Sequence, residues 1–339
     1  MTNTKTLKTP SDRTMNRLIV GAILVLALGI PLIGVLYVLD RYVAPPPPIV
    51  DQKALELEDA VRKTPNNLTL RLRLAGAYTA SKRYDEAVAQ FDEVLTATDA
   101  LKPEDALGFR KTSHLGRGDA LRLQGDLDGA ALDYQAVVEL AKDGEFAPVD
   151  RELESAYFQL GGVALTQGRP TAAVTSLEAA LAINHTDADT LHLLGQAYLG
   201  TGDAEKAVEP LREAVLFVPI GWCEPYATLG QAYTSLGRPE EATWASSMAA
   251  FCTDQTVDPS ATLKGLVDGP AGLDALVGLG LIAEIRGDRV SAADWYRQAI
   301  AQQPDDFTAS SGLSRVAPTE DAGPTPVAPP ASPAPGGNS

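Results

Sequence analysis

An internal repeat constrains the fold of this chain more than any other feature of its sequence. The pattern Leu-Gly-x-x-Tyr begins at Leu194 and again at Leu229, 35 residues later. A glycine turn follows each copy, at Gly202 and Gly237, and an alanine-rich apolar stretch follows each turn. Repeats of this length are typical of units made of two short helices, and one such unit cannot bury its apolar face alone. The sequence therefore predicts an array whose neighbouring units share a continuous core.

The alanine that follows the turn recurs six times along the chain, at Ala87, Ala130, Ala173, Ala207, Ala242 and Ala292. Prolines, which cannot continue a helix, stand where the second helix of a unit should end, at Pro65, Pro219 and Pro304. This pattern resembles the tetratricopeptide repeat (TPR), a helix-turn-helix unit of about 34 residues. The resemblance implies an all-α TPR solenoid of about six repeats over residues 51–315, with cap helices at 51–63 and 307–315.

Several positions depart from the TPR pattern. Polar or charged side chains occupy usually apolar positions in the first two units, at Arg71, His114 and Arg117. The fifth unit has Ser246 where an aromatic residue is usual. Extra residues lengthen three of the spacings between units, and we expect elongated helix ends or loops near 99–110, 143–153 and 254–270.

A long uncharged segment precedes the array. Residues 18–39 carry no charged side chain, and as a helix they would span about 33 Å, enough to cross a bilayer core. A cleaved signal peptide is the alternative, but its apolar region is usually shorter, and Pro45 after the obvious cleavage site at Ala44 disfavours cleavage. The preceding tail is basic, with Lys5, Lys8, Arg13 and Arg17 against Asp12. The positive-inside rule then keeps the N-terminus in the cytoplasm.

These features divide the chain into five predicted parts. They are a cytoplasmic tail (1–17), a transmembrane anchor helix (18–39), a Pro-rich spacer (40–50), the TPR solenoid with its caps (51–315) and a disordered Pro/Ala-rich tail (316–339). The prediction is a single-pass protein of the cytoplasmic (inner) membrane. It contacts the lipid bilayer through residues 18–39, and its TPR domain is extracytoplasmic, which in a bacterium means periplasmic.

Composition excludes several classes of function. Lys plus Arg number 28 against 44 for Asp plus Glu, so the formal net charge is -16 and the chain would repel the phosphates of nucleic acids. Two cysteines and three histidines are too few for a cysteine-rich zinc module, and no third ligand accompanies His185 and His192. No nucleophile and base stand in a recognisable arrangement. We predict no catalytic activity, no metal site, no cofactor and no nucleic-acid partner.

The two cysteines are candidates for a disulfide. Cys223 opens the first helix of the fifth unit and Cys252 closes its second helix, and antiparallel helices bring such ends together. An exported location permits the bridge, and in the chain-entropy model closing a loop of about 30 residues stabilises by roughly 3 kcal/mol. The alternative is a pair of buried free thiols.

The TPR resemblance also implies a right-handed superhelix whose concave face is lined by fixed positions of each first helix. In this chain those positions include Phe158, Asp189, His192, Gln196, Glu224, Gln231 and Thr234. Gln196 and Gln231 are equivalent, and their amides can donate to and accept from an extended peptide backbone. The alternative is that both are ordinary surface residues. The carboxylate clamp of some family members is absent, because its Lys and Asn positions are Leu72 and Gly76 here.

Much of the concave face is small or apolar, and the pattern continues it into the sixth unit with Val277, Leu281 and Ile285. Such a surface suits an amphipathic helix or a hydrophobic peptide, and an acidic exterior favours basic clients. The leading hypothesis is a membrane-anchored scaffold or assembly chaperone for a protein or peptide client, similar in architecture to bacterial anchored TPR proteins of envelope biogenesis. The alternative is a permanent structural subunit of a larger membrane protein complex.

Overall fold

Helix pairs make up almost all of the chain that the structure, a computed structural model, describes: residues 20, 49–217 and 221–317. Within these residues there are fifteen α-helices and one 3₁₀-helix, and no strand. Six pairs correspond to the six predicted units: α3 (Leu68–Ala80) with α4 (Tyr84–Thr98), α5 (Pro103–Gln124) with α6 (Leu127–Ala141), α7 (Arg151–Thr166) with α8 (Pro170–Ile183), α9 (Ala188–Thr201) with α10 (Ala204–Phe217), α11 (Glu224–Ser235) with α12 (Pro239–Thr253), and α14 (Gly272–Ile285) with α15 (Arg289–Gln302).

The remaining elements lie at the ends of the array and in the insertions. Helix α2 (Ile49–Lys63) precedes the first unit and α16 (Phe307–Val316) follows the last. The 3₁₀-helix η1 (Ala147–Val149) and the short helix α13 (Ser260–Lys264) lie in two of the insertions, and the other insertion lengthens α5 to 22 residues. The predicted all-α solenoid of helix pairs is confirmed.

Short-range signals in the sequence set the ends of these helices. The carboxylates of Asp126, Asp187 and Asp306 each accept a hydrogen bond from a backbone N–H in the first turn of α6, α9 and α16. Gly125 and Gly202 end α5 and α9 with φ values of 99° and 84°, in the left-handed region that glycine adopts most readily. These signals keep the turns within the pairs short.

Packing within a regular unit places a large residue of the second helix directly over a small residue of the first. A Cβ atom added to Gly161 would lie 2.5 Å from Leu177 Cδ2, and one added to Gly118 would lie 2.7 Å from Tyr134 Cε1. The turn-following alanines of five units are completely buried: Ala87, Ala130, Ala173, Ala207 and Ala292. The corresponding Ala242 of the fifth unit is only partly buried.

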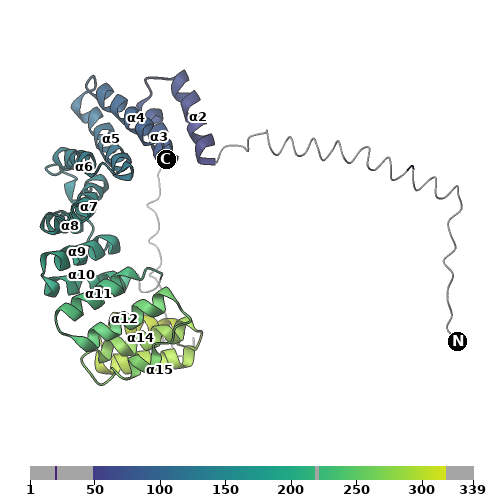
Figure 1. Cartoon of the computed structure of the whole chain (residues 1–339), viewed down its shortest axis with the longest axis vertical. Helices are drawn as coiled ribbons and strands as arrows, with labels where there is room; N and C mark the ends of the chain where they lie inside the picture. The colour runs from purple at the N-terminus through teal and green to yellow at the C-terminus, as the bar shows by residue number, and fades with distance from the viewer. Residues whose placement is uncertain (1–19, 21–48, 218–220, 318–339) are drawn as a thin grey trace, which may run out of the picture.

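The first helices of units one to five line the inner side of a curved array. Successive first helices contact one another from α3 through α5, α7 and α9 to α11, whereas the second helices α4, α6, α8, α10 and α12 make no comparable contacts with each other. An array whose first helices approach more closely than its second helices curves with the first helices inside. Figure 1 shows the resulting open arc, from α2 and α3 at one end to α14 and α15 at the other.

The stacking changes between the fifth and sixth units. Helix α14 approaches the backbone of α12 at few points and that of α11 hardly at all, and α13 lies between the two units in the chain. Side chains of α14 also reach α10: Arg212 donates two hydrogen bonds to the Asp274 carboxylate, with N–O distances of 2.7 and 2.8 Å. A single apolar core joins buried residues from α10 through α14. The sixth unit therefore turns back toward the second helix of the fourth.

The predicted membrane anchor lies almost entirely outside the described residues. Within the described residues, no helix combines the length and the apolar character that a bilayer span requires. Apart from Val20, the predicted anchor at 18–39 lies outside the described residues, as do the tail at 1–17, residues 40–48 and residues 318–339.

Candidate functional site

Helix α11 carries an accessible part of the inner face. Glu224, Gln231 and Thr234 lie along it and are all exposed. The Thr234 hydroxyl donates to Gly230 O at 2.7 Å, so its oxygen still has a lone pair for a hydrogen bond from outside. This row, which we call the α11 row, presents a carboxylate, an amide and a hydroxyl to solvent.

His192 of α9 lies in the contact between two units. The residue is 5% exposed, and Nε2 lies 3.0 Å from Thr228 Oγ1 on α11 and 3.1 Å from Gln196 Nε2. The ring of Trp222 meets the imidazole edge-on, with centroids 4.9 Å apart. Burial lowers the pKa of His192 below its ordinary value of 6.5, and the Glu224 carboxylate opposes that shift. The histidine therefore joins α9 to α11 and is largely covered.

The equivalent glutamines have different surroundings. Gln231 is exposed, whereas Gln196 is half-buried and its amide is next to His192. Asp189, one turn before His192 on α9, is exposed at the edge of the inner face. Partial desolvation of its carboxyl group by neighbouring protein atoms, and then the nearby Asp187 carboxylate, raises the pKa of Asp189 above its ordinary value. Only Gln231 of the two glutamines is thus fully open to a client.

Phe158 of α7 forms an apolar part of the same face. The side chain is half-buried and packs with Leu165 and Leu193 against the core of the third and fourth units. From α7 to α11 the inner face thus changes from apolar to polar.

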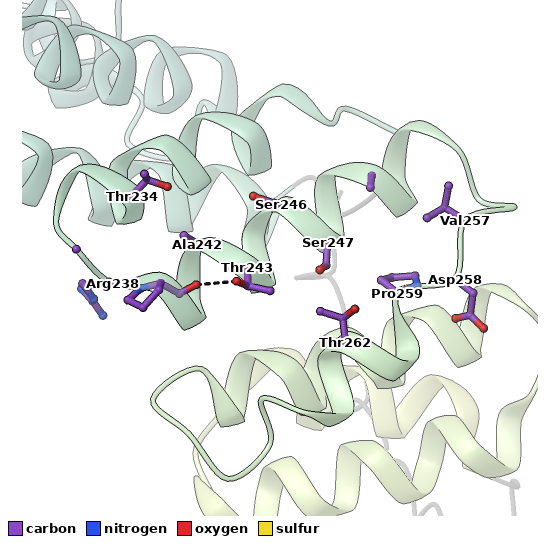
Figure 2. A pocket seen from close by; sticks show the side chains of 13 residues that line it. Thr234, Arg238, Ala242, Thr243, Ser246, Ser247, Val257, Asp258, Pro259 and Thr262 are labelled. Carbon is purple, nitrogen blue, oxygen red and sulfur yellow. Dashed lines mark hydrogen bonds between the residues drawn. The ribbon is translucent and has the colours of Figure 1, made fainter.

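A groove of about 890 Å³ opens beside Thr234, where the regular stacking ends. Small side chains of α12 around Ser246 form one wall, and Val257 and Thr262 belong to the other, as Figure 2 shows. In the regular units a large side chain fills the position of Ser246. Here Ser246 is exposed, and α14 leaves the adjacent surface of α12 largely uncovered. The α11 row therefore leads into a groove with small and hydroxyl-bearing walls.

The sixth unit does not continue the inner face. Val277 and Leu281 of α14 line a separate cavity whose opposite wall is α10, and Ile285 packs against the core that joins α10 to α14. The expectation that these three residues extend the concave face is wrong, because the insertion before α14 allows this helix to turn toward α10.

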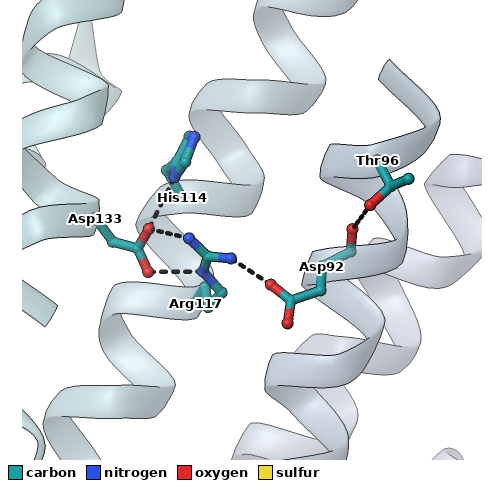
Figure 3. A network of polar contacts seen from close by, with 5 residues as sticks. All are labelled: Asp92, Thr96, His114, Arg117 and Asp133. Atoms are coloured by element: carbon teal, nitrogen blue, oxygen red, sulfur yellow. Dashed lines mark hydrogen bonds and ion pairs between the residues drawn. The ribbon is translucent and has the colours of Figure 1, made fainter. Parts of the chain in front are cut away.

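The polar departures of the second unit form an ion-pair network (Figure 3). Arg117 Nε lies 2.8 Å from Asp133 Oδ2, Arg117 also pairs with Asp92 of α4, and His114 Nδ1 lies 2.8 Å from Asp133 Oδ1. Burial alone would raise the pKa of the Asp133 carboxyl, but hydrogen bonds from Arg117 and His114 hold it below its ordinary value. The network joins the two helices of the second unit and, through Asp92, connects them to the first unit, and we assign it a structural role.

Cys223 and Cys252 form a disulfide, with their Cα atoms 5.5 Å apart. The bridge closes the end of the fifth unit that lies away from the turn between α11 and α12. Among the described residues, no group of three or more His, Cys, Asp or Glu side chains is placed to hold a metal ion.

Models of one protein family match several parts of the sequence. Models described as Tetratricopeptide repeat match residues 53–106, 109–145, 164–219 and 261–307, which together are more than half of the chain. No curated protein matches the sequence.

Solved structures resemble this chain at low sequence identity. BtubC (BKLC) from P. vanneervenii is 14% identical with a TM-score of 0.50, over 61% of this chain and 89% of that chain. The C-terminal part of a TPR repeat-containing protein from Cytophaga hutchinsonii is 19% identical with a TM-score of 0.49, over 78% and 94%. MamA is 23% identical with a TM-score of 0.46, over 56% and 93%. At these identities the likeness concerns the fold alone.

Proposed function

Because this chain belongs to the tetratricopeptide repeat family, we propose that it is a membrane-anchored scaffold or assembly chaperone that binds a protein or peptide client through its inner face. The observation that carries the proposal is the exposed α11 row, Glu224, Gln231 and Thr234, which leads into the groove beside α12. An open arc offers such a surface to an extended or helical segment without any rearrangement of its core.

The chemistry of this surface favours an amphipathic client. The Gln231 amide can pair with both the N–H and the C=O of a peptide backbone. The small side chains around Ser246 let a helix approach α12 closely, much as the first helix of a next unit would. Glu224 and the net charge of -16 favour basic side chains on the client. Phe158, farther along the face, adds an apolar contact.

The location of the client follows from the N-terminal sequence. An uncharged run at 18–39 after a basic tail supports a single anchor in the cytoplasmic membrane, with the repeats on the extracytoplasmic side. Such an anchor would hold the client near the bilayer surface. The Pro-rich residues 45–48 would keep the array a short distance from the lipid headgroups.

Site-specific photocrosslinking in whole cells tests this function. A photoreactive residue at Gln231 should capture a discrete set of neighbours that mass spectrometry identifies. Gln135 is the matched control, because it is also an exposed glutamine but lies on α6, a second helix. Equal yields and identical partners from the two positions would contradict binding through the inner face.

The same crosslinked partners distinguish a scaffold or chaperone from a permanent structural subunit. A client should dissociate when detergent extracts are washed at high salt, because charge complementarity contributes to its binding. A subunit should remain stoichiometric through the same wash. If every partner crosslinked from Gln231 stays at constant stoichiometry through the wash, the protein is a permanent structural subunit and not a chaperone.

A further inference from the structure

A second cavity lies where the sixth unit turns back onto the fourth. It has a volume of about 500 Å³ and lies between α10, α12, α14 and the residues around the start of α16. Its apolar lining includes Val215, Tyr226, Met248 and Leu281. None of the inner-face residues assigned above lines it. The cavity is therefore distinct from the surface of the proposed function.

A buried donor without a partner lies in the wall of this cavity. Trp244 is 6% exposed, and its indole Nε1–H makes no hydrogen bond with any described residue. The Nε1 atom lies beside Gly278, another lining residue: a Cβ added there would be 3.5 Å from it. Leaving a buried N–H unpaired is unfavourable, so an acceptor supplied from outside would be stabilised there. A peptide carbonyl is such an acceptor.

The rim of the cavity is acidic and partly apolar. Glu209, Glu213 and Asp305 lie around it, and none of them forms an ion pair with a described residue. The one cationic side chain in the lining, Arg212, is already paired with Asp274. Phe307 also belongs to the rim and is 73% exposed. A partner segment with positive charge beside an apolar group would therefore complement both the acidic and the apolar parts of this rim.

We propose that this cavity binds an apolar side chain from a lysine- or arginine-rich segment of a partner protein. The apolar side chain fills the space between Tyr226, Met248 and Leu281. A backbone carbonyl of the segment accepts the hydrogen bond from Trp244 Nε1. The flanking basic side chains pair with Glu209, Glu213 and Asp305 at the rim.

The test uses the full chain in nanodiscs of zwitterionic lipid and a defined probe. The probe is a fluorescein-labelled, acetylated and amidated peptide in which a phenylalanine stands between two short runs of lysine. Fluorescence anisotropy should report saturable binding, with empty nanodiscs as the blank. A peptide with glutamate in place of lysine, and one with alanine in place of phenylalanine, should each bind more weakly.

Two variants at the rim keep the test independent of folding, because their side chains are exposed or half-exposed. Glu209→Gln combined with Glu213→Gln should weaken binding about tenfold, since two surface ion pairs are lost. Phe307→Ala should also weaken it. Asp143→Asn combined with Glu145→Gln is the control, because it changes the net charge equally at exposed positions outside the cavity lining. Equal binding to the control and to the first double variant would overturn the proposal.

Fluorine NMR of protein labelled with fluorotryptophan provides a second readout. The chain has three tryptophans, and Trp244→Phe assigns the resonance of interest by its disappearance. Saturating probe peptide should shift the Trp244 resonance in the native chain. A Gln231→Ala variant should retain both the shift and the anisotropy signal, so failure of the inner-face proposal would not be mistaken for failure of this one. Binding without any shift at Trp244 would contradict docking in the cavity.

Discussion

The junction between units three and four and the junction between units five and six are built from the same kind of helix pair but stack differently. In the third unit Leu177 lies over Gly161 and is completely buried, and the first helix of the next unit packs alongside. In the fifth unit Ser246 occupies the corresponding position and is exposed. The first helix of the sixth unit, α14, therefore has no large side chain to cover at this position. One side chain per unit therefore helps decide whether a solenoid continues its curve. Where it is missing, the inner face ends in a groove.

The junction between the first two units differs from the irregular junction between units five and six in its use of charge, and the largest predicted effect concerns this difference. Arg117→Met should lower the free energy of unfolding by about 3–5 kcal/mol, because Asp133, 3% exposed, would lose its main counter-charge. Arg212→Met at the irregular junction should cost at most about 1 kcal/mol, because its ion pair is partly solvated. Urea unfolding followed by circular dichroism measures both.

The pH dependence of the free energy of unfolding provides a control for the Arg117→Met prediction. The pKa of Asp133 is lowered in the folded state, so its contribution to stability is complete above its ordinary value of 3.8 and is lost as the pH falls through the folded value. The Arg117→Met variant should lose most of this dependence. If the loss of stability at acid pH is unchanged in the variant, the network does not stabilise the junction between the first and second units.

The second prediction compares Leu177 of the third unit with Ser246, which occupies the corresponding position in the fifth unit. Leu177→Ala should destabilise by about 2–5 kcal/mol, because it leaves a cavity over Gly161 in a closed core. Ser246→Ala should change stability by less than about 0.5 kcal/mol, since the serine is already exposed and the groove already open. Comparable losses in the two variants would mean that Ser246 stabilises the fifth unit in a way its exposure does not suggest.

The third prediction concerns the glycines of the first helices that lie beneath Leu177 and Ser246. Gly161→Ala should destabilise by about 1–3 kcal/mol, because the added methyl group would lie 2.5 Å from Leu177. Gly230→Ala, at the equivalent position of the fifth unit, places its methyl group 3.1 Å from the Ser246 hydroxyl, which can rotate away. Alanine favours a helix over glycine by about 1 kcal/mol, so this variant should be neutral or more stable. Opposite signs for the two melting-temperature shifts would support the comparison, and equal destabilisation would contradict it.

The regular junctions could be predicted from the sequence because each depends on nearby contacts. A repeat of small, large and turn residues brings the two helices of a unit together, and these contacts recur at a fixed separation along the chain. The irregular junction could not be predicted in the same way. Its contacts join residues far apart in the sequence, such as Arg212 and Asp274, which are 62 residues apart and lie on either side of an insertion of no regular pattern. Ser246 was the available signal, but on its own it indicates only a missing contact and not where α14 goes.

The same distinction applies to the candidate site. The repeat pattern places Gln231 and Thr234 on the inner face of a first helix, and both are exposed there. The burial of His192 does not follow from that pattern, because Trp222, which covers its ring, lies just before α11. The cavity beside Trp244 was likewise missed, since its walls come from three different units.

The smallest predicted effect concerns His192, which joins α9 to α11 at a regular junction that lies next to the irregular one. Burial lowers its pKa in the folded state below the ordinary value of 6.5, so the folded chain binds fewer protons than the unfolded chain in this range. The free energy of unfolding should therefore be highest above pH 6.5, fall as the pH decreases from 6.5 to the folded value, and then level off. His192→Gln, which cannot titrate, should flatten this part of the profile in urea unfolding measured at a series of pH values. A profile that keeps its slope in the variant would show that the junction between α9 and α11 does not sense protonation, and that the slope arises elsewhere in the chain.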